Sequence, residues 1–167
     1  VRYQEGGQAH RFQGSPEAPP PGLRGAVAAL HALVSGTLPV VVDLSTTPEA
    51  WPRDPFQIGA AAIHGDLMEV GVTFAGGCRA HAFHAVVWGG WMESFPVQIR
   101  VFLSHDGRGD TCKALLSRDL RFDLGPVKKA YQAAYGMGEP GTTTVVLLLE
   151  DPLLMNPLGA RRLEYVF

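Results

Sequence analysis

The chain has 167 residues, of which 46% are hydrophobic and 18% charged, and its formal net charge at pH 7 is −2. This length is enough for one domain with its own hydrophobic core. With so small a net charge and no basic stripe, nucleic acid and anionic membrane surfaces are poor partners. The longest apolar runs, 25–34 and 144–149, fall well short of the roughly 20 residues that span a bilayer, so no transmembrane span is expected.

The first 36 residues predict a small β-hairpin followed by a helix. Two short extended segments, 1–5 and 8–13, flank Gly6-Gly7, a pair that adopts the positive φ angles of a tight turn at little cost. After a proline-rich stretch, apolar residues recur at helical spacing and predict a helix over residues 23–35. Residues 37–55 contain a short apolar run and then several prolines, which indicates a strand and a linker.

From residue 56 onward the sequence consists mainly of predicted strands. Two runs, 56–63 and 67–74, flank a compact turn at His64–Asp66 and predict a β-hairpin. The run 96–104 alternates between apolar and other residues, so one of its faces should point to the core. The residues expected on that face are Val97, Ile99, Val101 and Leu103. Further strands are predicted at residues 81–88, 111–116, 120–124, 142–149 and 162–167.

A single predicted helix, residues 126–135, interrupts these strands. Its apolar stripe consists of Val127, Tyr131 and Ala134, which should dock on a sheet. Many short strands joined by glycine and proline turns, with one inserted helix, favour a mainly β fold. We expect an antiparallel sandwich or barrel-like sheet over residues 56–167.

The densest group of polar residues has two halves, each containing one of the only two cysteines. Residues 76–83 read Gly-Gly-Cys-x-x-His-x-Phe, and residues 105–112 read His-Asp-x-x-Gly-Asp-x-Cys. In this order, together with Ser94-Phe95-Pro96 and Phe122-Asp123-Leu124, they resemble elements of uncharacterised bacterial exported proteins and lipoproteins. The resemblance covers about residues 55–167. It implies an exported β domain and supplies no activity.

Three interpretations of the cysteines remain open. Cys78 and Cys112 could form a disulfide, which an oxidising compartment favours. Alternatively, Cys78, His81, His105 and Asp110 are ligand types that zinc accepts in a four-coordinate site. The third interpretation is two unrelated buried thiols.

Three aromatic residues, Trp88, Trp91 and Phe95, surround the pair Gly89-Gly90. Aromatic side chains on a glycine-rich loop can form a binding platform for sugars, peptides or apolar groups. They can equally fill the end of a β-sandwich core. The sequence leaves both roles open.

No catalytic residue is predicted, because nucleophile elbows, phosphate-binding loops and zinc-protease motifs are missing from the sequence. The leading hypothesis is a non-enzymatic, exported or envelope-associated β domain that binds a protein or small-molecule ligand, or stabilises an assembly. It needs no cofactor. The chain starts at Val1 instead of methionine, which favours a removed upstream segment and leaves export open, with a cytoplasmic location as the alternative. One alternative is a metal-binding protein that uses the zinc ligands named above. The other is a protease inhibitor, because the first 36 residues faintly resemble part of the emfourin-type inhibitors of thermolysin-like proteases.

Overall fold

The computed structural model consists of two compact units, residues 1–35 and 36–167. It describes residues 2–5, 8–11, 36–137, 142–150 and 160–167. In the first unit, β1 (Arg2–Glu5) and β2 (Gln8–Arg11) pair antiparallel with Glu5 opposite Gln8, which agrees with the predicted hairpin. The helix predicted over residues 23–35 lies outside the described residues.

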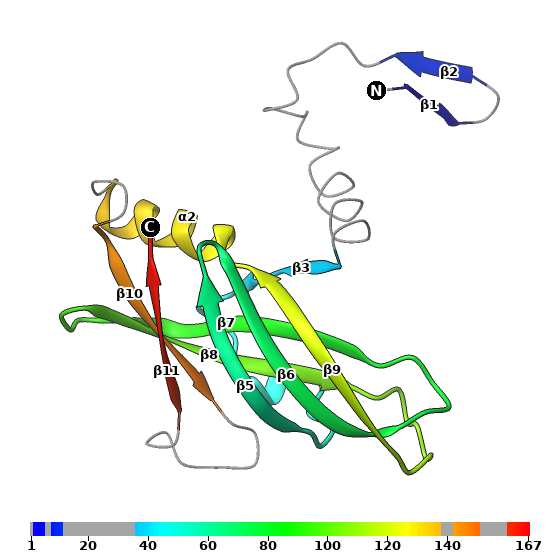
Figure 1. Ribbon diagram of the computed structural model, residues 1–167. Coiled ribbons are helices and arrows are strands. Elements are labelled where there is room, and N and C mark those ends of the chain that lie inside the picture. Colours follow the sequence, from blue (N-terminus) through cyan, green and yellow to red (C-terminus); the bar gives the residue numbers. More distant parts are fainter. Residues whose placement is uncertain (1, 6–7, 12–35, 138–141, 151–159) are drawn as a thin grey trace. The chain divides into compact units, whose positions relative to one another are not determined.

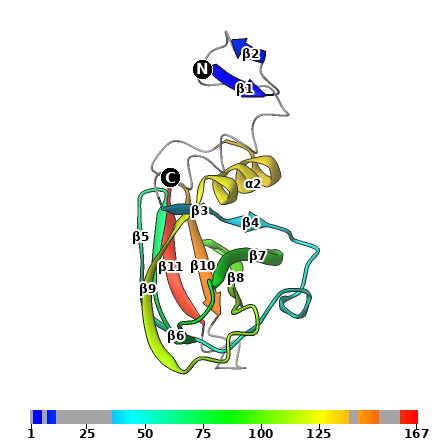
Figure 2. The same cartoon turned by 90° about the vertical axis from the view of Figure 1, so that its right-hand side faces the viewer.

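Two packed β-sheets form the second unit, as Figures 1 and 2 show. The five-stranded sheet has the order β11-β10-β8-β7-β4, with β4 (Val41–Val42), β7 (Ala82–Met92), β8 (Val97–Asp106), β10 (Thr144–Glu150) and β11 (Arg161–Val166). The four-stranded sheet has the order β3-β9-β6-β5, with β3 (Thr37–Pro39), β5 (Gln57–His64), β6 (Leu67–Gly76) and β9 (Ala114–Asp123). A 3₁₀ helix, η1 (Pro48–Ala50), and the helix α2 (Gly125–Tyr135) complete the described elements. No described helix is both long and apolar enough to span a membrane.

The mainly β prediction is confirmed, but both sheets are mixed and not purely antiparallel. Strand β10 pairs parallel to β8, β4 parallel to β7, and β3 parallel to β9. The chain leaves β8, passes through β9 and α2, and returns beside β8, and such a crossover produces a parallel pair. The predicted hairpin of β5 and β6 is present. The strands predicted at 111–116 and 120–124 are one strand, because every residue of β9 pairs with β6.

The two sheets are connected along both edges. Residues 37–42 pass from one sheet to the other, since β3 pairs with β9 whereas β4 pairs with β7, and Val40 between them is buried. At the opposite edge the Arg161 guanidinium on β11 donates to the carbonyl oxygens of Ile58 and Gly59 on β5. The segment 37–55, interpreted from the sequence as a strand and a linker, thus contributes strands to both sheets of this unit.

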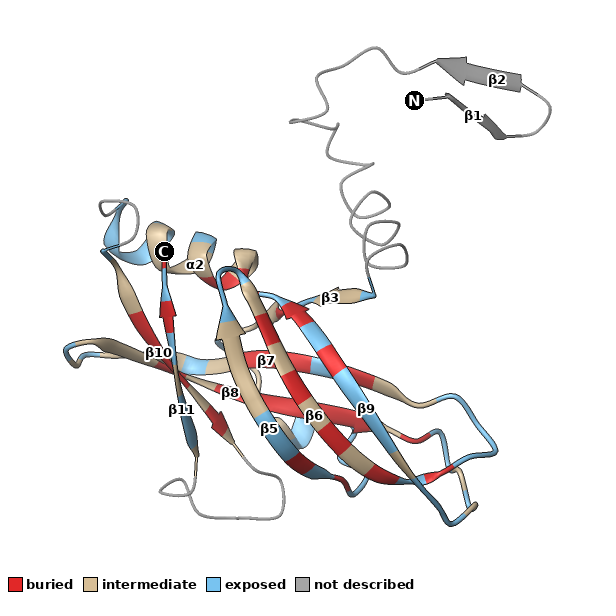
Figure 3. Ribbon diagram, viewed as in Figure 1, coloured by how far each residue is buried: buried red, intermediate tan, exposed pale blue. Residues whose placement is uncertain are grey.

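Alternation along β6 builds the core between the sheets. Met68, Val70, Val72 and Phe74 are buried, and Figure 3 shows buried segments alternating with partly exposed ones along this strand. On β8 the expected core residues Ile99, Val101 and Leu103 are buried, whereas Val97 is only partly buried. A one-residue slip of either strand would turn these side chains to the other face, so burial fixes the register.

The outer face of β8 is also covered, which the alternation did not predict. Phe102 and Ser104 are buried there. The indole of Trp51 lies edge-on to the Phe102 ring, with centroids 6.4 Å apart, and the Ser104 hydroxyl donates to the carbonyl of Pro52 over 2.9 Å. The segment after η1 therefore lies on the outside of this sheet.

Asp123 precedes helix α2, and its carboxylate accepts the N–H of Gly125 over 2.8 Å. The N-cap residue, Leu124, makes no side-chain cap hydrogen bond. Val127 is fully buried, and the ring of Tyr131 packs against Phe167. Ala134 is exposed, so its predicted place in the docked stripe is wrong. The last turn of the helix contributes little to the core, which ends at Tyr131.

Candidate functional site

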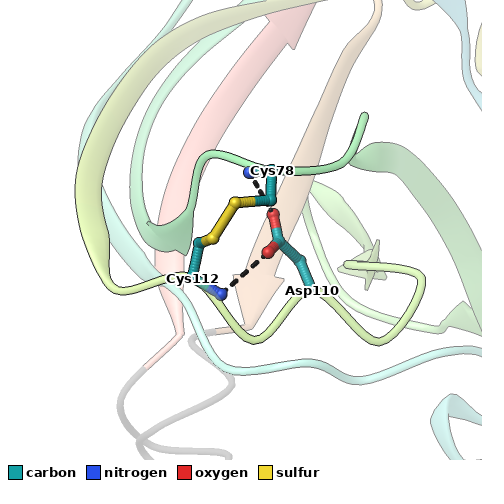
Figure 4. A group of neighbouring side chains, drawn as sticks. All are labelled: Cys78, Asp110 and Cys112. Atoms are coloured by element: carbon teal, nitrogen blue, oxygen red, sulfur yellow. Dashed lines mark hydrogen bonds between the residues drawn. A yellow bond between two sulfur atoms is a disulfide. The ribbon is translucent and has the colours of Figure 1, made fainter.

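Two loops at one end of the second unit bring together the polar residues singled out in the sequence. The loop between β6 and β7 carries Cys78, and the loop between β8 and β9 carries Asp110 and Cys112 (Figure 4). Cys78 and Cys112 form a disulfide with their Cα atoms 5.8 Å apart. This separation lies within the range of ordinary disulfides.

Asp110 joins the same two loops a second time, through hydrogen bonds. Its Oδ2 accepts the backbone N–H groups of Gly77, Cys78 and Arg79, each over 2.9 Å. Its Oδ1 accepts the N–H of Cys112, also over 2.9 Å. The Cys112 hydrogen bond is the largest influence holding the pKa of Asp110 well below its usual range, and burial opposes it. Asp110 is therefore an ionised carboxylate whose side chain is only 1% exposed.

Two buried histidines continue this network into the core. Nε2 of His81 lies 3.2 Å from Oδ2 of Asp110, and Nδ1 of the same ring lies 2.8 Å from Nε2 of His105. Nδ1 of His105 in turn lies 3.0 Å from the carbonyl oxygen of Asp54. The result is an unbroken chain of hydrogen bonds from a carboxylate to a backbone carbonyl.

The two ends of this chain determine which ring atoms donate. The carbonyl of Asp54 and the carboxylate of Asp110 only accept, so Nδ1 of His105 and Nε2 of His81 each donate an N–H to the group they face. Burial lowers the pKa of His105.

Tight packing surrounds this chain. The ring of Phe83 stacks on His105 with centroids 4.3 Å apart, and Phe74 lies 4.7 Å from His81. A Cβ at Gly76 would come within 2.5 Å of the His81 ring, so only glycine fits at this position without displacement. The two imidazoles are thus enclosed by core residues, and the arrangement is that of a structural network.

The structure brings Cys78, His81, His105 and Asp110 together, although they do not surround a common point. The Cys78 sulfur is bonded to Cys112, and the two nitrogens of His81 bond opposite neighbours. Sequence reasoning missed Asp54, whose carboxylate also accepts the N–H of Gly107 over 2.6 Å. Nothing in its proline-rich surroundings indicates a contact with a residue more than fifty positions later.

The three aromatic residues of the suggested platform are separated by the structure. The indole N–H of Trp88 donates to Glu150 over 3.2 Å, and the Arg100 guanidinium lies over its ring. Burial raises the pKa of Glu150. Trp91 instead packs against helix α2. Trp88 and Trp91 are three positions apart, so even a regular strand directs them to opposite faces. The register of β7 also shifts between Trp88 and Met92, around Gly89-Gly90, both with positive φ.

Phe95 differs from both tryptophans, because its side chain is fully exposed at the tip of the hairpin of β7 and β8. Below it, the Ser94 hydroxyl donates to the carbonyl of Pro96 over 2.7 Å and accepts from the Gln98 amide over 2.9 Å. Tyr135, at the end of α2, donates to the carboxylate of Glu93 over 2.9 Å. That hydrogen bond fixes the end of α2 beside the hairpin tip.

Large apolar side chains gather at this end of the molecule. Tyr135, the last residue of α2, is 41% exposed, and Met137, two positions beyond it, is 86% exposed. Glu93 holds this end of α2 beside the hairpin tip that carries Phe95. We call Phe95, Tyr135 and Met137 the tip surface. Figure 1 shows the hairpin of β7 and β8 reaching past β10 and β11. The tip surface is thus exposed and built on a turn that hydrogen bonds hold in place.

Comparison with known proteins identifies a fold and no family. No family model matches the chain, and no curated protein matches its sequence. A NigD-like immunity protein from Bacteroides caccae is similar in structure, with 15% identity and a TM-score of 0.52 over 78% of this chain and 64% of that one. A protein of unknown function from Bacteroides vulgatus has 13% identity and a TM-score of 0.47 over 78% of this chain and 56% of that one. The chain spans less than two thirds of either protein, and the first likeness shows a shared β fold.

Proposed function

We propose that the chain is a non-enzymatic, exported or envelope-associated binding module that contacts a partner protein through the tip surface. The observation that carries the proposal is the full exposure of Phe95 on a braced hairpin tip. Exposed aromatic side chains on rigid supports are typical of the residues that dominate protein interfaces, since little conformational entropy is lost when they bind.

The shape of the tip surface favours a protein partner over a small ligand. Small molecules are bound in concave sites that enclose most of their surface. Phe95 instead projects from the end of a hairpin, where it can insert into a pocket of another macromolecule. Tyr135 and Met137 then add apolar contact beside this anchor.

The polar network in the loops between β6 and β7 and between β8 and β9 supports a non-catalytic role. Asp110, His81 and His105 are buried, and each of their hydrogen-bonding groups described above bonds another part of the protein. General acid–base catalysis requires such groups to reach a substrate. In this chain they hold loops together.

The disulfide supports export, because such bonds persist in oxidising compartments and are rare in the cytosol. The test is to alkylate thiols in intact cells, denature the protein without reduction and alkylate again with a heavier reagent. We expect neither label on Cys78 or Cys112. A fully labelled chain would contradict an exported location.

Photo-crosslinking tests the binding surface. A photoreactive phenylalanine analogue placed at Phe95 should join one protein in cells, whereas the same analogue at Leu115 should not. Leu115 is a matched control, because it is 78% exposed but lies on β9, outside the tip surface. The crosslinked protein must then bind the purified chain, and Phe95→Ala must weaken that binding. Crosslinking to a second copy of this chain, or equal crosslinking from both positions, would overturn the proposal.

A further inference from the structure

The disulfide and Asp110 form a compact cluster of groups that bind metals. The sulfur atoms of Cys78 and Cys112 and a carboxylate oxygen of Asp110 all lie within 4.8 Å of one another. As a disulfide the sulfurs cannot bind a metal as thiolates. We infer that reduction converts this cluster into a zinc site with Cys78, Cys112 and Asp110 as its protein ligands.

The carboxylate network keeps this site assembled when the disulfide is open. Asp110 accepts N–H groups from Gly77, Cys78 and Arg79 in one loop and from Cys112 in its own. None of these hydrogen bonds involves a sulfur atom. Reduction therefore leaves both thiols facing each other across the same carboxylate.

The distances suit tetrahedral zinc. Sulfur ligands about 2.3 Å from zinc lie about 3.8 Å apart in a tetrahedron. The Cα atoms of the two cysteines are 5.8 Å apart, so small rotations about their Cα–Cβ bonds suffice to reach this separation. Oδ1 of Asp110 accepts one N–H and retains a lone pair for a metal. Water would fill the fourth position.

Charge and surroundings also fit a zinc ion. Two thiolates and the Asp110 carboxylate are anionic ligands of the types that zinc binds. His81 donates to Asp110 and so acts as the second-layer histidine partner of a ligating carboxylate. This assignment differs from the ligand set suggested by the sequence, because Cys112 replaces both histidines.

The redox step balances with an external reductant. Each sulfur gains one electron and one proton when the S–S bond breaks, and a phosphine reductant is oxidised to its oxide with oxygen from water. Zinc then displaces the two thiol protons. Cys78 is exposed and Cys112 partly exposed, so both the reductant and the metal reach the site from solvent.

The experiment uses the full chain. It is reduced with a phosphine, the phosphine is removed under anaerobic conditions, and the chain is titrated with Co²⁺ and then with Zn²⁺. We expect one Co²⁺ per chain with thiolate charge-transfer and tetrahedral visible bands, which Zn²⁺ abolishes. The oxidised chain should give neither band. Asp106→Asn, a change at the carboxylate that ends β8, should bind within twofold of the wild type, whereas Cys112→Ser should bind at least tenfold more weakly.

X-ray absorption of the zinc-loaded wild-type chain identifies the ligands directly, without an Asp110→Asn variant that could fail to fold. Two sulfur and two oxygen neighbours without an imidazole signature are expected. Histidine neighbours, or a reduced folded chain that binds no more zinc than the Cys78→Ser/Cys112→Ser variant, would overturn it. The inference of a zinc site does not depend on the proposed partner protein, so one of the two proposals can fail while the other holds.

Discussion

Removing the disulfide should weaken the protein without disturbing its folded structure. The bond links residues separated by 34 positions, and closing a loop of this length in the unfolded chain contributes about 3.8 kcal/mol in the chain-entropy model. The Cys78→Ala/Cys112→Ala variant should therefore lose roughly that free energy of unfolding. The folded state should persist, because Asp110 joins the same two loops by three backbone hydrogen bonds and accepts a fourth within its own loop.

Urea unfolding of the oxidised wild type and of the variant measures this loss. The variant's unfolded state is less restricted and exposes more surface, so its m value should rise as its midpoint falls. Near-ultraviolet circular dichroism of the two folded proteins should agree. A loss below about 1 kcal/mol would contradict the entropic argument, and a variant without native near-ultraviolet signal would show that Asp110 cannot hold the loops.

Three further predictions concern the core and the buried network. Tyr131→Ala should lower the free energy of unfolding by about 2 kcal/mol, less than the 3–5 kcal/mol for a fully buried aromatic ring, because Tyr131 is only partly buried; an unchanged urea midpoint would refute its docking role. Gly76→Ala should lower the free energy of unfolding by roughly 1–3 kcal/mol, because the added Cβ overpacks against His81. Gly59→Ala, whose added Cβ would lie 3.4 Å from the backbone, should lower it much less, and equal losses for the two variants would contradict tight packing at Gly76. The pKa values of His105 and Asp110 are lowered on folding, so the folded chain binds fewer protons than the unfolded one, and stability should fall as the pH drops below 6.5 and fall again below 3.8. Stability that rises from pH 6.5 to 5 would show the sign to be wrong.

Local patterns predicted much of the fold because they reflect burial directly. The alternation of β8 identified its core face, except at Val97, and the turn at His64–Asp66 identified the hairpin of β5 and β6. The parallel strand pairs could not be predicted from local patterns, because they depend on where a strand returns to the sheet after a crossover. The middle of β9 reads as a break, since Ser117 to Asp119 are polar and exposed, and only pairing with β6 shows one strand.

The sequence identified the residues of the candidate site but not the hydrogen bonds that connect them. Cys78, His81, His105 and Asp110 stood out as a dense polar group, and they do meet. Their roles depend on which atoms face one another, and residue type and spacing do not specify that. Asp54 could not be identified, because its contribution to the His105 bond is a backbone carbonyl that every residue has.

The sequence pattern also did not distinguish Phe95 from the two nearby tryptophans. The sequence grouped it with Trp88 and Trp91. Those two residues are three positions apart, so on a strand they point to opposite faces, and Phe95 lies beyond the end of β7. The alternative of a protease inhibitor rested on the first 36 residues, of which the structure describes residues 2–5 and 8–11. That alternative stays a sequence-based hypothesis.

The affinity of the crosslinked partner for three purified chains tests the central claim most directly. Calorimetry should give the same dissociation constant for the wild type and for Leu115→Ala, and one at least tenfold weaker for Phe95→Ala. Because both side chains are exposed, neither change should alter folding. Equal affinities for all three chains would contradict the account of Phe95 as the anchor of a binding surface.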